Sequence, residues 1–195
     1  MGGAWGRCPD GDAGGLTAGQ LSVAAALLGV MSTAEHLAAI DALRSRDFPV
    51  ERGRSPSGVG GPGYHIAELL TSGDFWEDDG TEWEATSDQY DAERDGLTVL
   101  LAERWGAPQM FSLASVFERA QGDGFADADG NGDDGAGEDV DAGEDIPEPW
   151  DSLSCSVPDL HLWRVDGRWI ALGVSQWDKE SPFQLLAVVT EIDPP

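Results

Sequence analysis

Three residues in the C-terminal part of the chain carry side chains that nucleophilic catalysis uses. Cys155, Asp159 and His161 fall within seven residues, and a thiol becomes a reactive thiolate at neutral pH when an imidazole lies beside it. The strand pairing expected for this region, however, places His161 on a sheet face with Trp163, where a histidine is usually packed. No Gly-x-Ser-x-Gly turn is present either. A small hydrolase or ligand-binding domain, with a pocket between sheet and helices, is therefore an alternative function and not the leading one.

A second group of residues has the spacing of calcium ligands. The segment from Asp127 to Glu138 fits a calcium-loop pattern and, over these 12 residues only, resembles the EF-hand family. The resemblance implies oxygen ligands from Asp127, Asp129, Asn131, Asp133 (through its carbonyl) and Glu138. Two features depart from the family: Asp134 stands where it places an apolar residue, and prolines and glycines after Asp139 replace an exiting helix. A calcium-responsive module is the second alternative; no other metal or cofactor is expected.

Four of the eight tryptophans stand beside carboxylates in expected turns or helix starts. We expect Trp83 and Trp150 to be core residues whose acidic neighbours point to solvent. Trp76 and Trp177 fall in expected loops, and an exposed aromatic anchor among carboxylates suits a basic partner, because the ring supplies affinity and the charge steers association. The candidate partner-binding residues are Trp76, Asp78, Asp79, Trp177, Asp178 and Glu180.

The charge of the chain supports the same partner class. The sequence has 37 Asp and Glu against 11 Lys and Arg, a formal net charge of -26. Eleven of the acids lie between Asp123 and Glu148 without a base, and the rest of the chain still carries a net charge of -15. Such a surface repels phosphate backbones and anionic membranes, so we expect neither nucleic acid nor membrane as a direct partner.

The leading prediction is a non-enzymatic, acidic interaction protein that binds a basic protein partner. An immunity-type inhibitor, which neutralises a cationic toxin or nuclease by imitating nucleic-acid charge, would have this profile. The two cysteines are too few for the disulfide framework of a small secreted domain. We therefore expect a cytoplasmic location.

The elements that must position these residues are helices followed by an antiparallel sheet, an α+β fold. Capping-box spacings at Ser32 and at Thr81 predict two helices, the second running to about Arg104. Residues 53–63 are rich in glycine and are expected to form a loop, residues 64–70 a short helix and residues 112–120 another.

The C-terminal residues predict a β-meander of at least three strands. Asp166-Gly167 has the composition of a type I′ turn between strands 160–165 and 168–174. A two-residue turn fixes the register, so that Arg164 opposes Trp169 and His161 opposes Leu172. Residues 183–192 are the third strand. Its core, residues 185–189, is apolar on both faces, so this strand is expected to lie centrally.

The domain organisation follows from these elements. Residues 1–30 are expected to be a poorly ordered extension and residues 31–120 the helical part of a single domain. Residues 121–145 have the composition of a flexible, acidic, low-complexity insertion. Residues 146–195 would form the β-meander part of the same domain.

Overall fold

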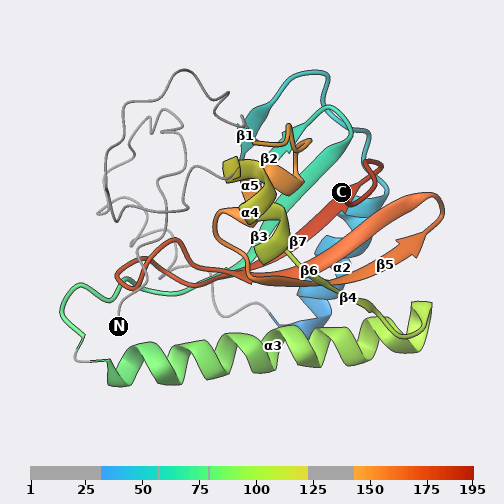
Figure 1. Cartoon of the computed structure of the whole chain (residues 1–195). Coiled ribbons are helices and arrows are strands. Elements are labelled where there is room, and N and C mark those ends of the chain that lie inside the picture. Colours follow the sequence, from blue (N-terminus) through green and yellow to red (C-terminus); the bar gives the residue numbers. More distant parts are fainter. Residues whose placement is uncertain (1–31, 57, 79, 123–142) are drawn as a thin grey trace, which may run out of the picture.

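The computed structural model describes residues 32–56, 58–78, 80–122 and 143–195. Within these residues seven strands form one antiparallel sheet in the order β1-β2-β3-β7-β6-β5-β4 (Figure 1). The strands are β1 (Gly53–Ser55), β2 (Gly58–Gly61), β3 (Tyr64–Thr71), β4 (Gln109–Ser112), β5 (Asp159–Val165), β6 (Arg168–Ser175) and β7 (Gln184–Thr190). The helices are α2 (Thr33–Arg44), α3 (Thr81–Trp105), α4 (Ala114–Gln121) and α5 (Trp150–Ser154). The fold class is α+β, as the sequence predicted.

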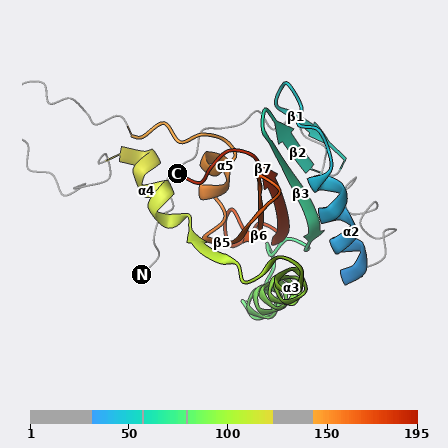
Figure 2. The ribbon, with the colours of Figure 1, turned by 90° about the vertical axis from the view of Figure 1, so that its right-hand side faces the viewer.

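The sheet joins two meanders. Strands β1, β2 and β3 form the first, strands β5, β6 and β7 the second, and the two meet where β3 pairs with β7. Helix α3 connects β3, inside the sheet, to β4, which is the edge strand farthest from β1. Figure 2 shows α2 and α3 on one side of the sheet and α4 and α5 on the other. The sheet is therefore the middle layer of three.

Each face of the sheet has its own apolar core. The first core contains side chains of α2 and α3, including Ile40, Tyr90 and Leu97, against Ile170 and Leu172 of β6. The second core packs α4, α5 and the segment after α5 onto the other face; its members include Val116, Trp150, Val157, Leu160 and Val188. Strand β7 contributes to both cores, which confirms the prediction of a central strand covered on both faces.

The hairpin between β5 and β6 has the predicted register. Arg164 pairs with Trp169 and His161 with Leu172. Asp166 and Gly167 have φ angles of 51° and 82°, as a type I′ turn requires. The Arg164 guanidinium lies 4.9 Å from the centroid of the Trp169 ring, and the Trp169 indole N–H donates to the Asp193 carboxylate over 2.8 Å.

Two predictions for residues 53–70 are wrong. The expected loop at 53–63 contains β1 and β2, and the expected helix at 64–70 is β3. Glycine is needed in this hairpin because a Cβ on Gly61 would lie 2.5 Å from the Tyr64 ring. The pairing of β3 with β7 shifts between Glu68 and Leu70, and this irregularity interrupts the alternation that identifies a strand. Residues 31–120 therefore supply four strands besides their helices.

The two predicted capping boxes had different outcomes. Ser32 and Glu35 make both hydrogen bonds of a capping box at the start of α2. Helix α3 instead begins after Gly80, whose φ is 102°, so the box at Thr81 and Glu84 is wrong. Tyr90, Leu97 and Leu101, which recur at helical spacing in the sequence, form an apolar stripe that α3 buries.

Two predicted segments lie outside the described residues. These are the N-terminal extension, residues 1–30, and most of the acidic insertion. Among the helices that the structure describes, none combines the length and the apolar character that crossing a membrane demands.

Candidate functional site

The two loops that carry Trp76 and Trp177 lie side by side at the end of the sheet where α3 begins (Figure 1). Residues 72–80 connect β3 to α3, and residues 176–183 connect β6 to β7. The Phe75 amide donates to the Glu180 carbonyl over 3.0 Å. The Ser72 amide donates to the Phe183 carbonyl, and the Phe183 amide donates to the Ser72 hydroxyl. We call the described residues of these two loops, 72–78, 80 and 176–183, together with Trp83, the tryptophan surface.

Asp78 fixes the first loop against α3. Its carboxylate accepts from the amides of Glu82 and Trp83, over 3.1 and 2.8 Å. These are amides of the first helical turn, which lack partners within the helix. Asp78 therefore caps the first turn of α3, a role that the sequence assigned to Thr81. Its partner-binding role stays a prediction.

The second loop is closed by its own polar side chains. The Asp178 carboxylate accepts from the amides of Glu180 and Ser181, over 3.1 and 2.7 Å. The Gln176 side chain donates to the Ser181 carbonyl and accepts from the Trp83 indole N–H over 3.1 Å. Gln176 thus ties the loop to α3, and both loops are held in place without a partner.

An aromatic cluster forms the floor of the tryptophan surface. The Phe183 ring is buried, and its centroid lies 5.7 Å from that of Phe75, 5.6 Å from that of Trp83 and 5.8 Å from that of Tyr90. Burial, reinforced by the charge of Glu93, raises the pKa of Tyr90 to about 12. The phenol is therefore neutral, and the floor is apolar.

The tryptophans of the two loops are exposed. Trp76 is 75% and Trp177 54% exposed, whereas Trp150 is fully buried and Trp83 packs against the first core, as predicted for those two. Across both loops the sequence places six carboxylates against a single lysine, Lys179. Of the predicted partner-binding residues, Trp76, Asp78, Trp177, Asp178 and Glu180 come together at this surface, and Asp79 lies outside the described residues.

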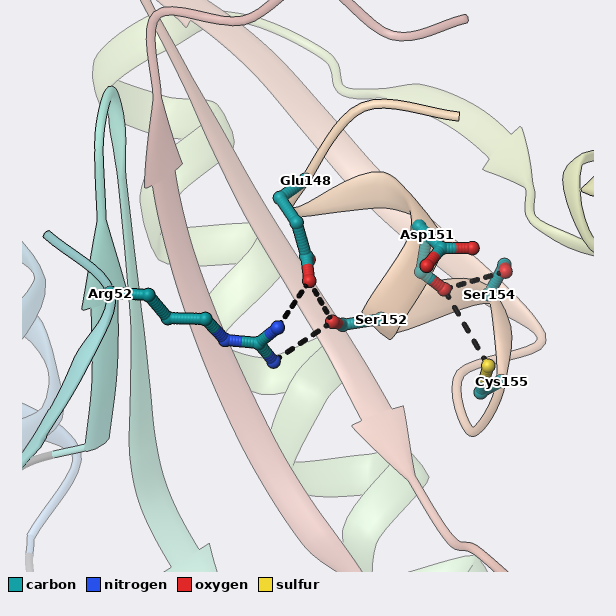
Figure 3. Close-up of polar contacts among 6 residues, drawn as sticks. All are labelled: Arg52, Glu148, Asp151, Ser152, Ser154 and Cys155. Carbon is teal, nitrogen blue, oxygen red and sulfur yellow. Dashed lines mark hydrogen bonds and ion pairs between the residues drawn. The ribbon is translucent and has the colours of Figure 1, made fainter. Parts of the chain in front are cut away.

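A polar cluster on the opposite face of the sheet was not predicted. Figure 3 shows the Arg52 guanidinium reaching from the residue before β1 to Glu148 and to Ser152 of α5. Arg52 lies 2.7 Å from the Glu148 carboxylate and 3.3 Å from the Ser152 hydroxyl, which itself donates to Glu148 over 2.7 Å. No pattern in the sequence indicates this contact, because about a hundred residues separate the partners. It joins the β1–β2 hairpin to α5.

Tyr64 is a buried residue near this cluster. It is 2% exposed, and among the described residues neither its hydroxyl nor Oε2 of Glu148 has a hydrogen-bond partner. Burial, followed by the charge of Glu148, raises the pKa of Tyr64. Burial, followed by the charges of Glu148 and Asp145, also raises the pKa of Asp151.

The structure does not bring Cys155 and His161 together. Cys155 follows α5, and its sulfur lies 3.6 Å from the Asp151 carbonyl oxygen (Figure 3). His161 faces α3 on the other side of the sheet, where Nδ1 lies 2.7 Å from the Thr98 hydroxyl. Because that hydroxyl donates its proton to the Arg94 carbonyl, the imidazole must donate to it. Burial lowers the pKa of His161, which describes a neutral, packed histidine.

Metal ligands are not assembled in the part of the chain that the structure describes. No group of three or more histidine, cysteine, aspartate or glutamate residues there could hold a metal ion. The calcium candidates Asp127, Asp129, Asn131, Asp133 and Glu138 lie outside the described residues. Calcium binding through residues 127–138 therefore stays a prediction.

Comparison of the chain with models of protein families, with curated proteins and with solved structures gave no match. A function is therefore inferred from the residues of this chain alone.

Proposed function

We propose that this protein is a non-enzymatic interaction protein that binds a basic protein partner through the tryptophan surface. The observation that carries the proposal is the backbone hydrogen bond between Phe75 and Glu180. It joins two loops that are about a hundred residues apart in sequence and that each present an exposed tryptophan among carboxylates.

The hydrogen bonds within and between the loops support this role. Asp78, Asp178 and Gln176 hold the loop backbones through hydrogen bonds. A surface that is already ordered loses little conformational freedom on binding, so more of the contact energy becomes affinity. Tryptophan anchors are over-represented among the residues that dominate such energies.

The charge supports a basic partner. The carboxylates of the two loops would attract a cationic surface over several ångströms and accelerate its approach. A protein that inhibits a cationic toxin or nuclease, by occupying the surface that binds nucleic acid, fits this chemistry. A hydrolase is not proposed, because Cys155 and His161 lie on opposite faces of the sheet.

Affinity purification from native extract tests the proposal. The wild-type chain, the W76A/W177A variant and the V99A/M110A variant serve as baits; Val99 and Met110 are also exposed but lie on α3 and β4, outside the tryptophan surface. We expect the wild type and V99A/M110A to retain the same basic protein and W76A/W177A to lose it. Retention by all three baits would contradict the proposal.

A further inference from the structure

The only lysine of the chain lies on the tryptophan surface and contacts an aromatic ring. Lys179 is exposed, and its ammonium nitrogen lies 5.8 Å from the centroid of the Trp83 ring. None of the ion pairs among the described residues includes Lys179. The amino group is thus positioned by an aromatic face and not by a carboxylate.

The neighbourhood of the Trp83 ring favours a cation. Glu82 and Glu84 flank Trp83 in sequence, and both are exposed. The ring itself is oriented from both ends, since its N–H donates to Gln176 and its backbone amide donates to Asp78. An indole face that is held in place attracts ammonium and guanidinium groups, and carboxylates on the same surface add to the attraction.

We infer that the exposed face of Trp83 is a cation subsite of the tryptophan surface, which Lys179 occupies in the free protein and an arginine of the partner occupies in the complex. The inference rests on the proposed function and names the chemistry of its partner. Arginine is favoured over lysine because a guanidinium is planar, stacks on aromatic rings and is less strongly hydrated than an ammonium. Lys179 would therefore compete with the incoming arginine. The larger the fraction of time that Lys179 covers the ring, the higher the apparent dissociation constant of the complex.

The binding of a hexa-arginine peptide at low ionic strength, followed by tryptophan fluorescence, measures this competition. Replacing Lys179 by Met keeps the apolar stem and removes the charge. The matched control is Arg104→Met, which changes the net charge equally at the far end of α3, about 30 Å from Trp83 at the helical rise. We expect K179M to bind the peptide about two- to five-fold more tightly than R104M does, the factor that one exposed cation–π contact provides.

The outcomes separate this inference from the proposed function. Equal affinities of K179M and R104M, with binding that still requires Trp76 and Trp177, would overturn the cation subsite alone, because the effect of Lys179 would then be one of net charge. Peptide binding that W76A/W177A leaves unchanged would instead overturn the proposed function and, with it, the subsite. Thermal unfolding of each variant verifies that affinities are compared between folded proteins.

Discussion

At the scale of single residues, burial divides aromatic side chains of similar sequence context into different roles. Trp150 and Trp76 both have acidic neighbours, yet the first, at the start of α5, is fully buried in the second core and the second is exposed in a loop. The sequence allowed this division because Trp150 follows an extended Pro-rich segment and Trp76 falls in an acidic turn. It did not foresee that Trp76 and Trp177 would share one surface, since the contacts that unite them involve Ser72, Phe75 and Glu180.

The two tyrosines offer a pH test of residue-scale burial. Both Tyr64 and Tyr90 have a raised pKa, that of Tyr90 about 12 against an ordinary 10.0. The folded state therefore keeps protons that the unfolded state loses. The contribution of each tyrosine to stability is full below pH 10 and falls as the pH rises through the raised pKa of the folded state, which is about 12 for Tyr90. Tyrosinate absorbance of the native protein should develop only above the ordinary pKa, and Y90F should lose the part of it that develops near pH 12. A normal titration midpoint in folded protein would contradict the buried placement.

At the scale of elements, the β2–β3 hairpin depends on glycine for close packing. Strand pairing places Gly61 opposite Tyr64, and the aromatic ring lies where a Cβ at position 61 would be. Glycines that a sequence pattern marks as a loop can therefore belong to strands that pack against a large side chain. This is why residues 53–63 were assigned incorrectly.

Two glycine substitutions test the hairpin. Gly61→Ala should lower the free energy of unfolding by about 1–3 kcal/mol, because the Tyr64 ring must move to admit the methyl group. Gly96→Ala is the matched change inside α3, where a Cβ meets nothing within 4 Å; it should raise the free energy of unfolding by about 0.5–1 kcal/mol through helix propensity. Urea unfolding measures both. A stabilising Gly61→Ala would show that the ring does not occupy that space.

The segments that the sequence predicted best are those governed by local chemistry. The Asp166-Gly167 turn fixes the β5–β6 register, and the apolar stripe fixes the face that α3 buries. The pairing of β3 with β7, the position of β4 at the far edge and the contact of Arg52 with Glu148 depend on residues distant in sequence. A single sequence carries no signal for such contacts, and the candidate site was accordingly predicted as separate residues rather than as one surface.

At the scale of the whole molecule, the acidic residues are divided between the described part of the chain and residues 123–142, which make up most of the predicted insertion. The described residues on either side of residues 123–142 lie close together: the Glu144 amide donates to the Arg119 carbonyl over 2.8 Å, and the two side chains form an ion pair at 3.1 Å. A Cβ on Gly143 would lie 2.8 Å from the Gly122 nitrogen. A short connection can therefore close this gap.

Replacing residues 123–142 by a short Gly-Ser linker tests that separation. The free energy of unfolding should stay the same or rise by about 1 kcal/mol, because a shorter loop costs less entropy to close. A loss of cooperative unfolding in the replaced chain would show that the insertion belongs to the fold. Calorimetry with calcium on both proteins examines the EF-hand resemblance, which equal heats would exclude.

The most direct measurement of the central claim is the dissociation constant of the captured basic partner for the wild type, W76A/W177A and V99A/M110A, at low and at high salt. We predict that W76A/W177A weakens the complex by about 30-fold or more, the factor of at least one binding hot spot, while V99A/M110A binds like the wild type and all three bind more weakly as salt screens the carboxylates. Equal affinities for the two double variants, or binding that does not change with salt, would contradict a role for the tryptophan surface.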